Sequence, residues 1–526
     1  MKANSLTRPI KRSPCCTSIL AWTFRKEELG LAVVVLCLLA AGPLSTRVEA
    51  FSLLGPYADW MDVEKGYRLP DDIGGPMNIT EGYRWNIPVL TYGFDQSFMD
   101  YFGSNGVAAV EQAIAMLNKI PPASVIDLQA YALRAWRANW RAESAELLDL
   151  KSQTLGLLLQ QMGLTDPVRN AFCIRDYQVY PGPSYYFDVI MRSFDPVTAQ
   201  PSHYVNGVLL SYQVFWMTPA PGQFFCDAQE IPVDAEAGGF EPVVSMSAHG
   251  YSPYGRFVTN LTREDIAGLR YLLSGGEVHC EALLPDVHLV NTNEGPLVVT
   301  ADRPGIEKVT FARHPAGPLN GRFLPFTNRW TDIYYGYFLP GYQEVERITT
   351  RPDILFTAAD LGASRGWSST GTTNWVNNAE LNGNPGGLGP GVIQPPVTIT
   401  YNSIGPFYIV PPAFSTNAFP TELSSYLVSG WGSFNGTTNP PITYPVGQTP
   451  FQPTEVRLTL RIQGKSYELR WPLPGRPYQR FAFQTGTNLT DWTTITTLTN
   501  SGATFEYQAD APPNEPARFF MTSPLP

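Results

Sequence analysis

The clearest alternation of hydrophobic and polar positions lies near the C-terminal end of the chain. Residues 456–462 (VRLTLRI) alternate strictly, and Tyr467, Leu469 and Trp471 resume the alternation after the turn-like stretch 463–466. A period of two places the apolar side chains of a strand on one face. The pattern therefore predicts a β-hairpin with one buried and one solvated face.

Helical periodicity appears in the N-terminal half. An apolar stripe at three- and four-residue spacing follows Ser104 or Asn105, either of which suits an N-cap. The stripe consists of Val107, Val110, Ile114 and Leu117. It predicts a helix that stops before Pro121.

Three more helices are predicted from capping signals. Ser124 and Asp127 resemble a capping pair for a helix to about residue 142, and residues 147–162 form an apolar run that ends at Gly163. Thr262 and Asp265 suit the start of a helix that residues 274–276 (SGG) close. Short apolar and aromatic runs between turn residues predict strands. These runs are 85–95, 177–180, 185–191, 208–217, 297–300, 308–312 and 330–337.

This order of elements predicts a multidomain fold, with an α+β N-terminal domain followed by all-β, sandwich-like modules. We place the N-terminal domain at 51–276, a β-rich middle region at 277–361 and a Gly/Asn/Pro-rich linker or long loop at 362–396. A β-sandwich-like module is predicted at 397–473 and a small C-terminal β module at 474–526. The 526 residues, 44% of them hydrophobic and 16% charged, have the composition of a folded chain.

The first fifty residues have the layout of a secretory signal peptide. Basic residues precede the uncharged run 29–41 (LGLAVVVLCLLAA), and a small-residue ending at Ala50 follows. The run is shorter than the roughly twenty residues that cross a bilayer. We therefore expect residues 1–50 to be a cleaved signal peptide, a secreted or cell-surface protein, and no permanent membrane anchor.

The net charge and the absence of known motifs argue against several classes of function. Without residues 1–50 the chain has 29 Lys and Arg against 43 Asp and Glu, a net charge of −14, which makes nucleic acid an unsuitable partner. The sequence contains no H-E-x-x-H, no G-x-S-x-G and no nucleotide-binding glycine motif. The densest group of metal-ligand types, residues 279–288, fits no standard ligand spacing. We therefore expect no metal and no cofactor, and the catalytic residues of any activity stay unknown.

Three cysteines remain after the signal peptide: Cys173, Cys226 and Cys280. An odd number in an oxidising compartment allows one disulfide and one free thiol. Cys173 and Cys226 both lie in strand-like aromatic segments. We therefore predict a disulfide between them.

Two resemblances bear on ancestry. Residues 91–118 resemble the opening strand and first helix of matrixin-type metallopeptidases, and residues 261–273 (LTREDIAGLRYLL) resemble the helix that closes such domains. The resemblance implies a metzincin-like domain that lacks the zinc motif. Residues 483–492 and 517–520 are similar to a short β module that ends many secreted proteins of verrucomicrobial and planctomycete-type bacteria. Segments such as 351–361 (RPDILFTAADL) resemble an uncharacterised secreted family of those bacteria, and this resemblance implies an extracellular location.

Aromatic side chains are the most suggestive functional feature. Exposed aromatics stack on sugars and anchor interfaces, whereas alternate aromatics of a strand pack in the core. The candidate binding aromatics are Trp330, Tyr334, Tyr335, Tyr337, Trp367 and Trp375. We expect an exported non-catalytic protein, structural or adhesive at the cell surface or in an extracellular assembly, with itself or a cell-surface polymer as partner. The alternatives are a secreted hydrolase (a divergent peptidase or carbohydrate-active enzyme) and a carbohydrate-binding protein.

Overall fold

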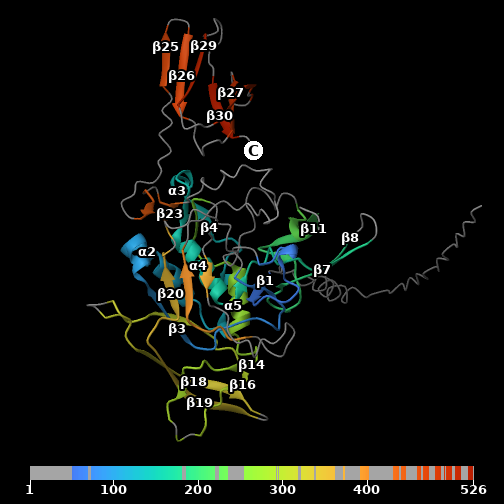
Figure 1. Cartoon of the computed structure of the whole chain (residues 1–526), viewed down its shortest axis with the longest axis vertical. Helices are drawn as coiled ribbons and strands as arrows, with labels where there is room; N and C mark the ends of the chain where they lie inside the picture. The colour runs from blue at the N-terminus through green and yellow to red at the C-terminus, as the bar shows by residue number, and fades with distance from the viewer. Residues whose placement is uncertain are drawn as a thin grey trace, which may run out of the picture. The chain divides into compact units, whose positions relative to one another are not determined.

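A computed structural model gives the arrangement of the chain (Figure 1). The structure describes residues 50–68, 73–180, 185–218, 224–234, 254–291, 293, 295–317, 321–336, 339–359, 361, 371–373, 391–401, 430–437, 440–445, 459–463, 466–472, 480–486, 491, 493–499, 504–510 and 519–524. The predicted signal peptide up to residue 49 lies outside this set. The described part is rich in strands and has few helices, which confirms the expected β-rich character.

A mixed five-stranded sheet lies at the centre. Its order is β17 (Thr310–Arg313), β3 (Val89–Phe94), β20 (Ile354–Thr357), β22 (Val397–Thr400) and β21 (Gly371–Thr373). The first four strands are parallel neighbours, and β21 runs antiparallel at the edge. Strand β3 is buried along its middle, as expected for a parallel strand covered on both faces. The sheet joins strands from both sides of the boundaries expected at 276, 361 and 396, so these boundaries do not separate independent sheets.

Helix α2 (Gln96–Asn118) follows β3 and packs on the sheet. Asp95 caps it through the Phe98 amide, and Gly103, at φ 60°, interrupts it. The stretch after Gly103 is the predicted helix, and its whole apolar stripe is buried. The part of α2 before Gly103 was not predicted, because its cap, Asp95, lies twelve residues before Val107, the first residue of the stripe.

Helix α4 (Leu150–Gln161) packs beside α2 (Figure 1) and is buried on nearly every side. A helix that is buried all round needs no amphipathic pattern. It ends before Gly163, whose φ of 94° suits the left-handed conformation after a helix. The predicted helix over 147–162 is confirmed except for its first three residues, which form strand β5 (Leu147–Asp149).

The helix predicted over 124–142 is wrong. This segment forms the short turns η2 (Ala123–Val125) and η3 (Leu128–Ala130), strand β4 (Trp136–Ala138) and helix α3 (Trp140–Ser144). Asp127 accepts a hydrogen bond from Gln129 only two residues on, which fixes a turn. Strand β4 pairs with β13 (Arg256–Val258), so a distant strand takes the backbone groups that a helix would have used internally.

Helix α5 (Arg263–Leu273) confirms the capping prediction. Thr262 and Asp265 form a reciprocal capping box, and the Thr262 amide donates to the Asp265 carboxylate at 3.0 Å. Ile266, Leu269 and Leu272 are buried against the core. The capping residues and the burial of the apolar face therefore favour the same helix.

An antiparallel five-stranded sheet follows α5. Its order is β14 (His279–Ala282), β16 (Thr300–Arg303), β18 (Phe326–Tyr335), β19 (Pro340–Thr349) and β15 (Val287–Leu289). Buried ion pairs stabilise this antiparallel sheet and join it to other parts of the chain. Arg84 Nε lies 2.6 Å from Glu281 Oε1, and Arg303 Nε lies 2.9 Å from Asp332 Oδ1. Arg347 bridges Asp286 and Asp353, and Asp353 in turn accepts from the Thr91 amide of β3 at 2.7 Å.

The remaining strands form smaller sheets. One contains β2 (Gly75–Met77), β1 (Phe51–Gly55), β6 (Leu164–Thr165) and β9 (Ser193–Phe194), and another contains β24 (Ile442–Tyr444), β23 (Gly430–Ser433) and β5.

The C-terminal part has two three-stranded sheets. The first consists of β25 (Thr459–Gln463), β26 (Ser466–Pro472) and β29 (Thr504–Asp510). The second consists of β28 (Thr493–Thr499), β27 (Arg480–Gly486) and β30 (Phe519–Pro524). The β25–β26 pair confirms the predicted hairpin. Because β26 also pairs with β29, one sheet spans the boundary expected at 473.

Candidate functional site

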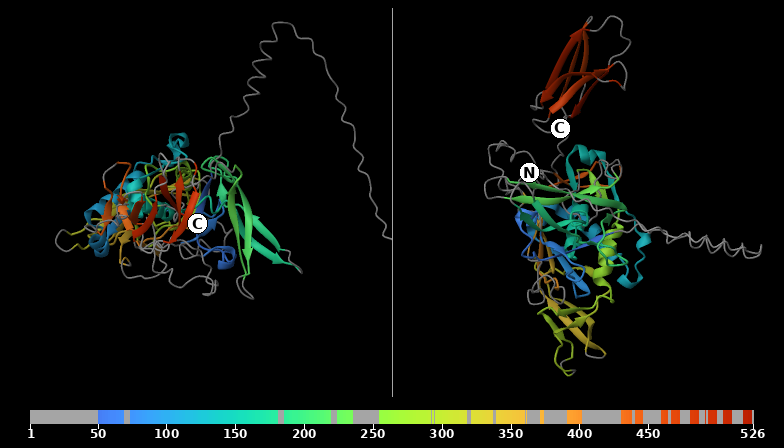
Figure 2. Two further views of the ribbon diagram at one scale, coloured as in Figure 1. Left: turned by 90° about the horizontal axis from the view of Figure 1, so that it is seen from above. Right: turned by 90° about the vertical axis from the view of Figure 1, so that its right-hand side faces the viewer.

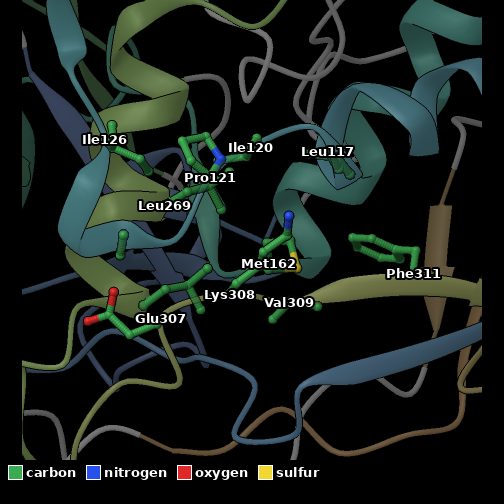
Figure 3. Close-up of a pocket in the computed structure, with 12 residues that line it drawn as sticks. Leu117, Ile120, Pro121, Ile126, Met162, Leu269, Glu307, Lys308, Val309 and Phe311 are labelled. Carbon is green, nitrogen blue, oxygen red and sulfur yellow. The ribbon is translucent and has the colours of Figure 1, made fainter.

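A small apolar hollow lies where α2, α4 and α5 end near β17 (Figure 3). Its volume is about 20 Å³, room for one water-sized body, and Leu117, Met162, Leu269 and Phe311 are among its lining residues. Glu307 borders it, but the Glu307 carboxylate accepts from the amides of Ser124 and Gly275 at 2.8 and 2.9 Å. A space of this size and lining is a packing defect and does not suit a ligand.

Filling this hollow should stabilise the protein. Val309 is buried and lines it, and Val309→Ile adds one methylene there. We expect the free energy of unfolding to rise by about 0.8 kcal/mol, measured as an increase in the urea midpoint. Val63→Ile, at an exposed position, is the control and should leave the midpoint unchanged. A lower midpoint for Val309→Ile would show that the lining cannot accept the added atom.

Two β ribbons form the most distinctive aromatic feature. Strands β7 (Cys173–Val179) and β8 (Tyr185–Ile190) pair with each other, and β11 (Val208–Met217) pairs with β12 (Phe225–Pro232). The start of β11 also pairs with the short strand β10 (Tyr204–Val205). The ribbons run side by side (Figure 2) and stack through aromatic rings. Tyr185 lies 4.2 Å from Trp216 and Tyr177 lies 4.4 Å from Phe224, between ring centroids. These contacts hold one ribbon against the other.

The opposite faces of both ribbons expose apolar side chains. On β8, Tyr186 points away from the stacked Tyr185 and is 57% exposed. On β11 and β12, Phe215 and Ile231 lie on the face opposite Trp216 and are 37% and 42% exposed. Among the described residues, no third strand pairs with β7 or β8, although β12 packs against β7.

The β18–β19 hairpin has a second exposed apolar face at its tip. Ile333 lies opposite Tyr342, and Tyr335 lies opposite Pro340. Tyr342 is 63% exposed and Leu339, in the turn, is 77% exposed. Further along the same face, Arg329 pairs with Glu346 at 2.9 Å. The apolar tip is thus separated from the body of the hairpin by a charged pair.

The predicted binding aromatics differ in their exposure. Tyr335 is on the exposed face, whereas Trp330 packs against the core and the Tyr334 ring lies across Gly341. A Cβ on Gly341 would come within 2.4 Å of that ring. Tyr337, Trp367 and Trp375 lie outside the described residues. Tyr342 and Phe215 were not among the predicted binding aromatics. The signal that could have identified them is the alternation of inward and outward side chains along their strands.

A cluster of titratable side chains lies where β12 meets β7. It consists of Tyr67, Asp166, Arg169, Cys173, Arg192, Asp227 and Glu230. Burial, with a smaller contribution from the Asp227 and Asp166 carboxylates, raises the pKa of Glu230 to about 10, and Arg169 opposes the rise. Burial also raises the pKa of Asp166 and that of Asp227. The ionised form of all three carboxyl groups is therefore disfavoured relative to a free carboxyl group in water.

The predicted disulfide is not formed in the structure: Cys173, Cys226 and Cys280 are free thiols. Cys173 lies on β7, whereas Cys226 lies on β12, where its cross-strand partner is Trp216 of β11. Burial raises the pKa of both Cys173 and Cys226 to about 12, so both sulfurs are held as thiols.

The group of potential metal ligands at 279–288 is used in ion pairing. Glu281 binds Arg84 and Asp286 binds Arg347, so both acids have cationic partners. His279 Nε2 lies 3.6 Å from Glu277 Oε2. Within the described ranges, no three His, Cys, Asp or Glu side chains converge as a metal site would require.

In the part of the chain that the structure covers, no helix has the length and apolar character needed to span a bilayer. No family model, curated protein or solved structure matches this chain.

Proposed function

We propose that this chain is an exported, non-catalytic structural protein that associates with further copies of itself through the outward faces of its β ribbons. In this proposal it is a multidomain protein, with an α+β N-terminal domain completed by β17, β20 and β22 and with sandwich-like β modules. It is secreted or held at the cell surface after removal of residues 1–50. The resemblances to a secreted bacterial family and to matrixin-type domains without zinc support the same compartment.

The exposed aromatic faces of the ribbons are the observation that carries the proposal. Large exposed apolar side chains on soluble proteins mark interaction sites, and Tyr186, Phe215 and Tyr342 are of the types enriched at interfaces. The outer edge of β8, with which no described strand pairs, would offer main-chain hydrogen bonds to an added strand. A second copy of the chain supplies both kinds of contact, because its own ribbons carry the same aromatics and the same edges.

The test is the mass of the purified mature chain, residues 51–526, measured by light scattering over a wide concentration range. We expect a concentration-dependent oligomer. Tyr186→Ser and Phe215→Ser should each raise the dissociation constant by about 30-fold if each residue is worth about 2 kcal/mol as an interface anchor. Trp140→Ser is the matched control, because Trp140 is 65% exposed on α3 and belongs to neither ribbon.

A wild-type chain that is monomeric at every concentration would refute self-association. Equal weakening of association by Trp140→Ser and by the ribbon variants would instead refute the assignment of the interface to the ribbons. Retention of the monomer on an insoluble cell-surface glycan, lost in Tyr186→Ser, would instead favour a carbohydrate-binding protein.

A further inference from the structure

The end of the β18–β19 hairpin (Figure 1) is apolar on both of its faces. We call this end the hairpin tip, and among the described residues it consists of Ile333, Tyr334, Tyr335, Leu339, Pro340, Gly341 and Tyr342. The outer face of the tip carries Ile333, Tyr335 and Tyr342, and the inner face carries the Tyr334 ring, which lies across Gly341. A flat partner would cover one of these faces, whereas a layer of lipid can surround both.

The hairpin tip is exposed and uncharged. Leu339 in the turn is 77% exposed, and Tyr342 is 63% exposed. The sequence from 333 to 343 contains no Asp, Glu, Lys, Arg or His. Tyrosine combines an apolar ring with a hydroxyl that stays hydrated, and it is enriched where membranes meet water. The tip therefore has the composition of a surface that lies between hydrocarbon and water.

The base of the hairpin holds the tip in place. On the inner face, Trp330 packs against the core, and Asp332 forms a buried ion pair with Arg303 at 2.9 Å. Val345 of β19 is fully buried on the same face. The tip is thus presented by a fixed pair of strands, and its insertion requires little further ordering of the chain.

Charged side chains begin a short distance behind the tip. Glu344 lies two residues from Tyr342 along β19, and the Arg329–Glu346 pair lies two residues further. At about 3.3 Å per residue, these side chains stand roughly 7 and 13 Å behind the paired Ile333 and Tyr342. From this pair to the last pair of the hairpin, the tip extends roughly 7 Å in the other direction. Peripheral apolar surfaces enter the boundary between headgroups and acyl chains by roughly 5–10 Å, a depth at which the backbone groups of a turn stay hydrated.

The charges near the tip select the kind of lipid. On the outer face, Glu344 and Glu346 follow the tip along β19, and Asp302 of β16 is the cross-strand partner of Tyr335. Arg329 is the cation of this group, and it pairs with Glu346 at 2.9 Å. The excess of carboxylates would repel an anionic headgroup. A zwitterionic headgroup presents an ammonium group to the carboxylates and a phosphate to Arg329, so its charges are complementary.

We propose that the hairpin tip inserts into the interfacial layer of a zwitterionic phospholipid membrane and holds the chain at that surface. The inference goes beyond the proposed function, because the tip belongs to neither aromatic ribbon and its insertion does not depend on self-association. Binding of this kind is peripheral and reversible, since a single hairpin tip buries few side chains.

The test is flotation of residues 51–526, the same chain used for light scattering, with vesicles of phosphatidylcholine. We expect binding that persists at high salt, because the burial of apolar groups is not screened. Leu339→Ser and Tyr342→Ser should each raise the dissociation constant by about tenfold, near the lower end of the effect of burying one large apolar side chain. Val197→Ser is the matched control and should bind like the wild type, because Val197 is 81% exposed but lies outside the hairpin.

Two further measurements separate insertion from adsorption by charge. Vesicles of phosphatidylcholine mixed with an equal amount of phosphatidylserine should bind the wild type more weakly than vesicles of phosphatidylcholine alone. Tyr342→Trp keeps an aromatic ring that suits the interface, and it should bind at least as tightly as the wild type.

A wild-type chain that does not float with phosphatidylcholine vesicles would overturn the inference. Tighter binding to the mixed vesicles would do the same, as would equal weakening by Val197→Ser and Leu339→Ser. Loss of self-association in Leu339→Ser, without vesicle binding by the wild type, would assign the tip to contacts between copies instead. A monomeric chain that binds vesicles through the tip would refute self-association alone.

Discussion

A chain carrying Arg84→Met is expected to lose about 3–5 kcal/mol of its free energy of unfolding, because a buried carboxylate is left without its cation. The Arg84 and Glu281 side chains are 1% and 0% exposed and lie 2.6 Å apart. Arg84 also donates to three backbone carbonyls, those of Leu272, Glu277 and Arg303. Methionine fills much of the same volume but donates no hydrogen bond to any of these acceptors.

The measurement is the urea midpoint of the wild type and of Arg84→Met. Arg329→Met is the matched control, because it breaks the Arg329–Glu346 pair, in which the arginine side chain is 64% exposed. We expect it to cost less than about 1 kcal/mol. Burial raises the pKa of Glu281 and Arg84 opposes the rise, so Arg84→Met should be less destabilised at acidic pH, where Glu281 is neutral. Equal losses for the two arginine variants would contradict the assignment of Arg84 as a buried structural cation.

Phe102→Ala should cost a similar amount, about 3–5 kcal/mol, for a different reason. Phe102 of α2 is fully buried, and its ring centroid lies 5.4 Å from that of Tyr401, 5.9 Å from Trp431 and 5.2 Å from Tyr444. Alanine removes the ring on which these three aromatics converge and leaves a cavity that rigid rings cannot collapse to fill.

Thermal and urea unfolding of Phe102→Ala would measure this loss. Tyr342→Ala removes an aromatic ring of similar size from a position that is 63% exposed, and it should change stability by no more than about 0.5 kcal/mol. Near-ultraviolet circular dichroism should also change in Phe102→Ala, since its neighbours lose their fixed packing. A Phe102→Ala chain as stable as Tyr342→Ala would mean that α2 does not organise this aromatic cluster.

Local signals predicted those elements that depend on local chemistry. The capping box of α5 and the apolar and aromatic run of β11 need only neighbouring residues, and both segments were located correctly. The segment 124–142 failed because β4 takes its hydrogen bonds from β13, more than a hundred residues away. The order of the central sheet was equally out of reach, since β3 takes its neighbours from β17 and β20.

The candidate site was predicted only in its composition. Alternation shows that Tyr334 and Tyr335 face opposite ways, but which of them is exposed depends on which face of β18 meets the core. The titratable cluster around Glu230 combines residues from four separate stretches of chain, and no single stretch carries a recognisable motif. Such a site becomes visible only when the ribbons are placed in space.

The pairing of β3 has a consequence for how the protein is made. The Thr91 amide bonds to Asp353, 262 residues further along the chain, so β3 has no complete sheet to join until that residue has emerged. At a synthesis rate of about 5–20 residues per second, this delay is roughly 13–50 s. If the chain is exported as proposed, the apolar β3 and α2 must stay soluble through translocation and that interval. In that case a holding chaperone on the far side of the membrane, rather than folding that keeps pace with synthesis, is expected to limit its yield.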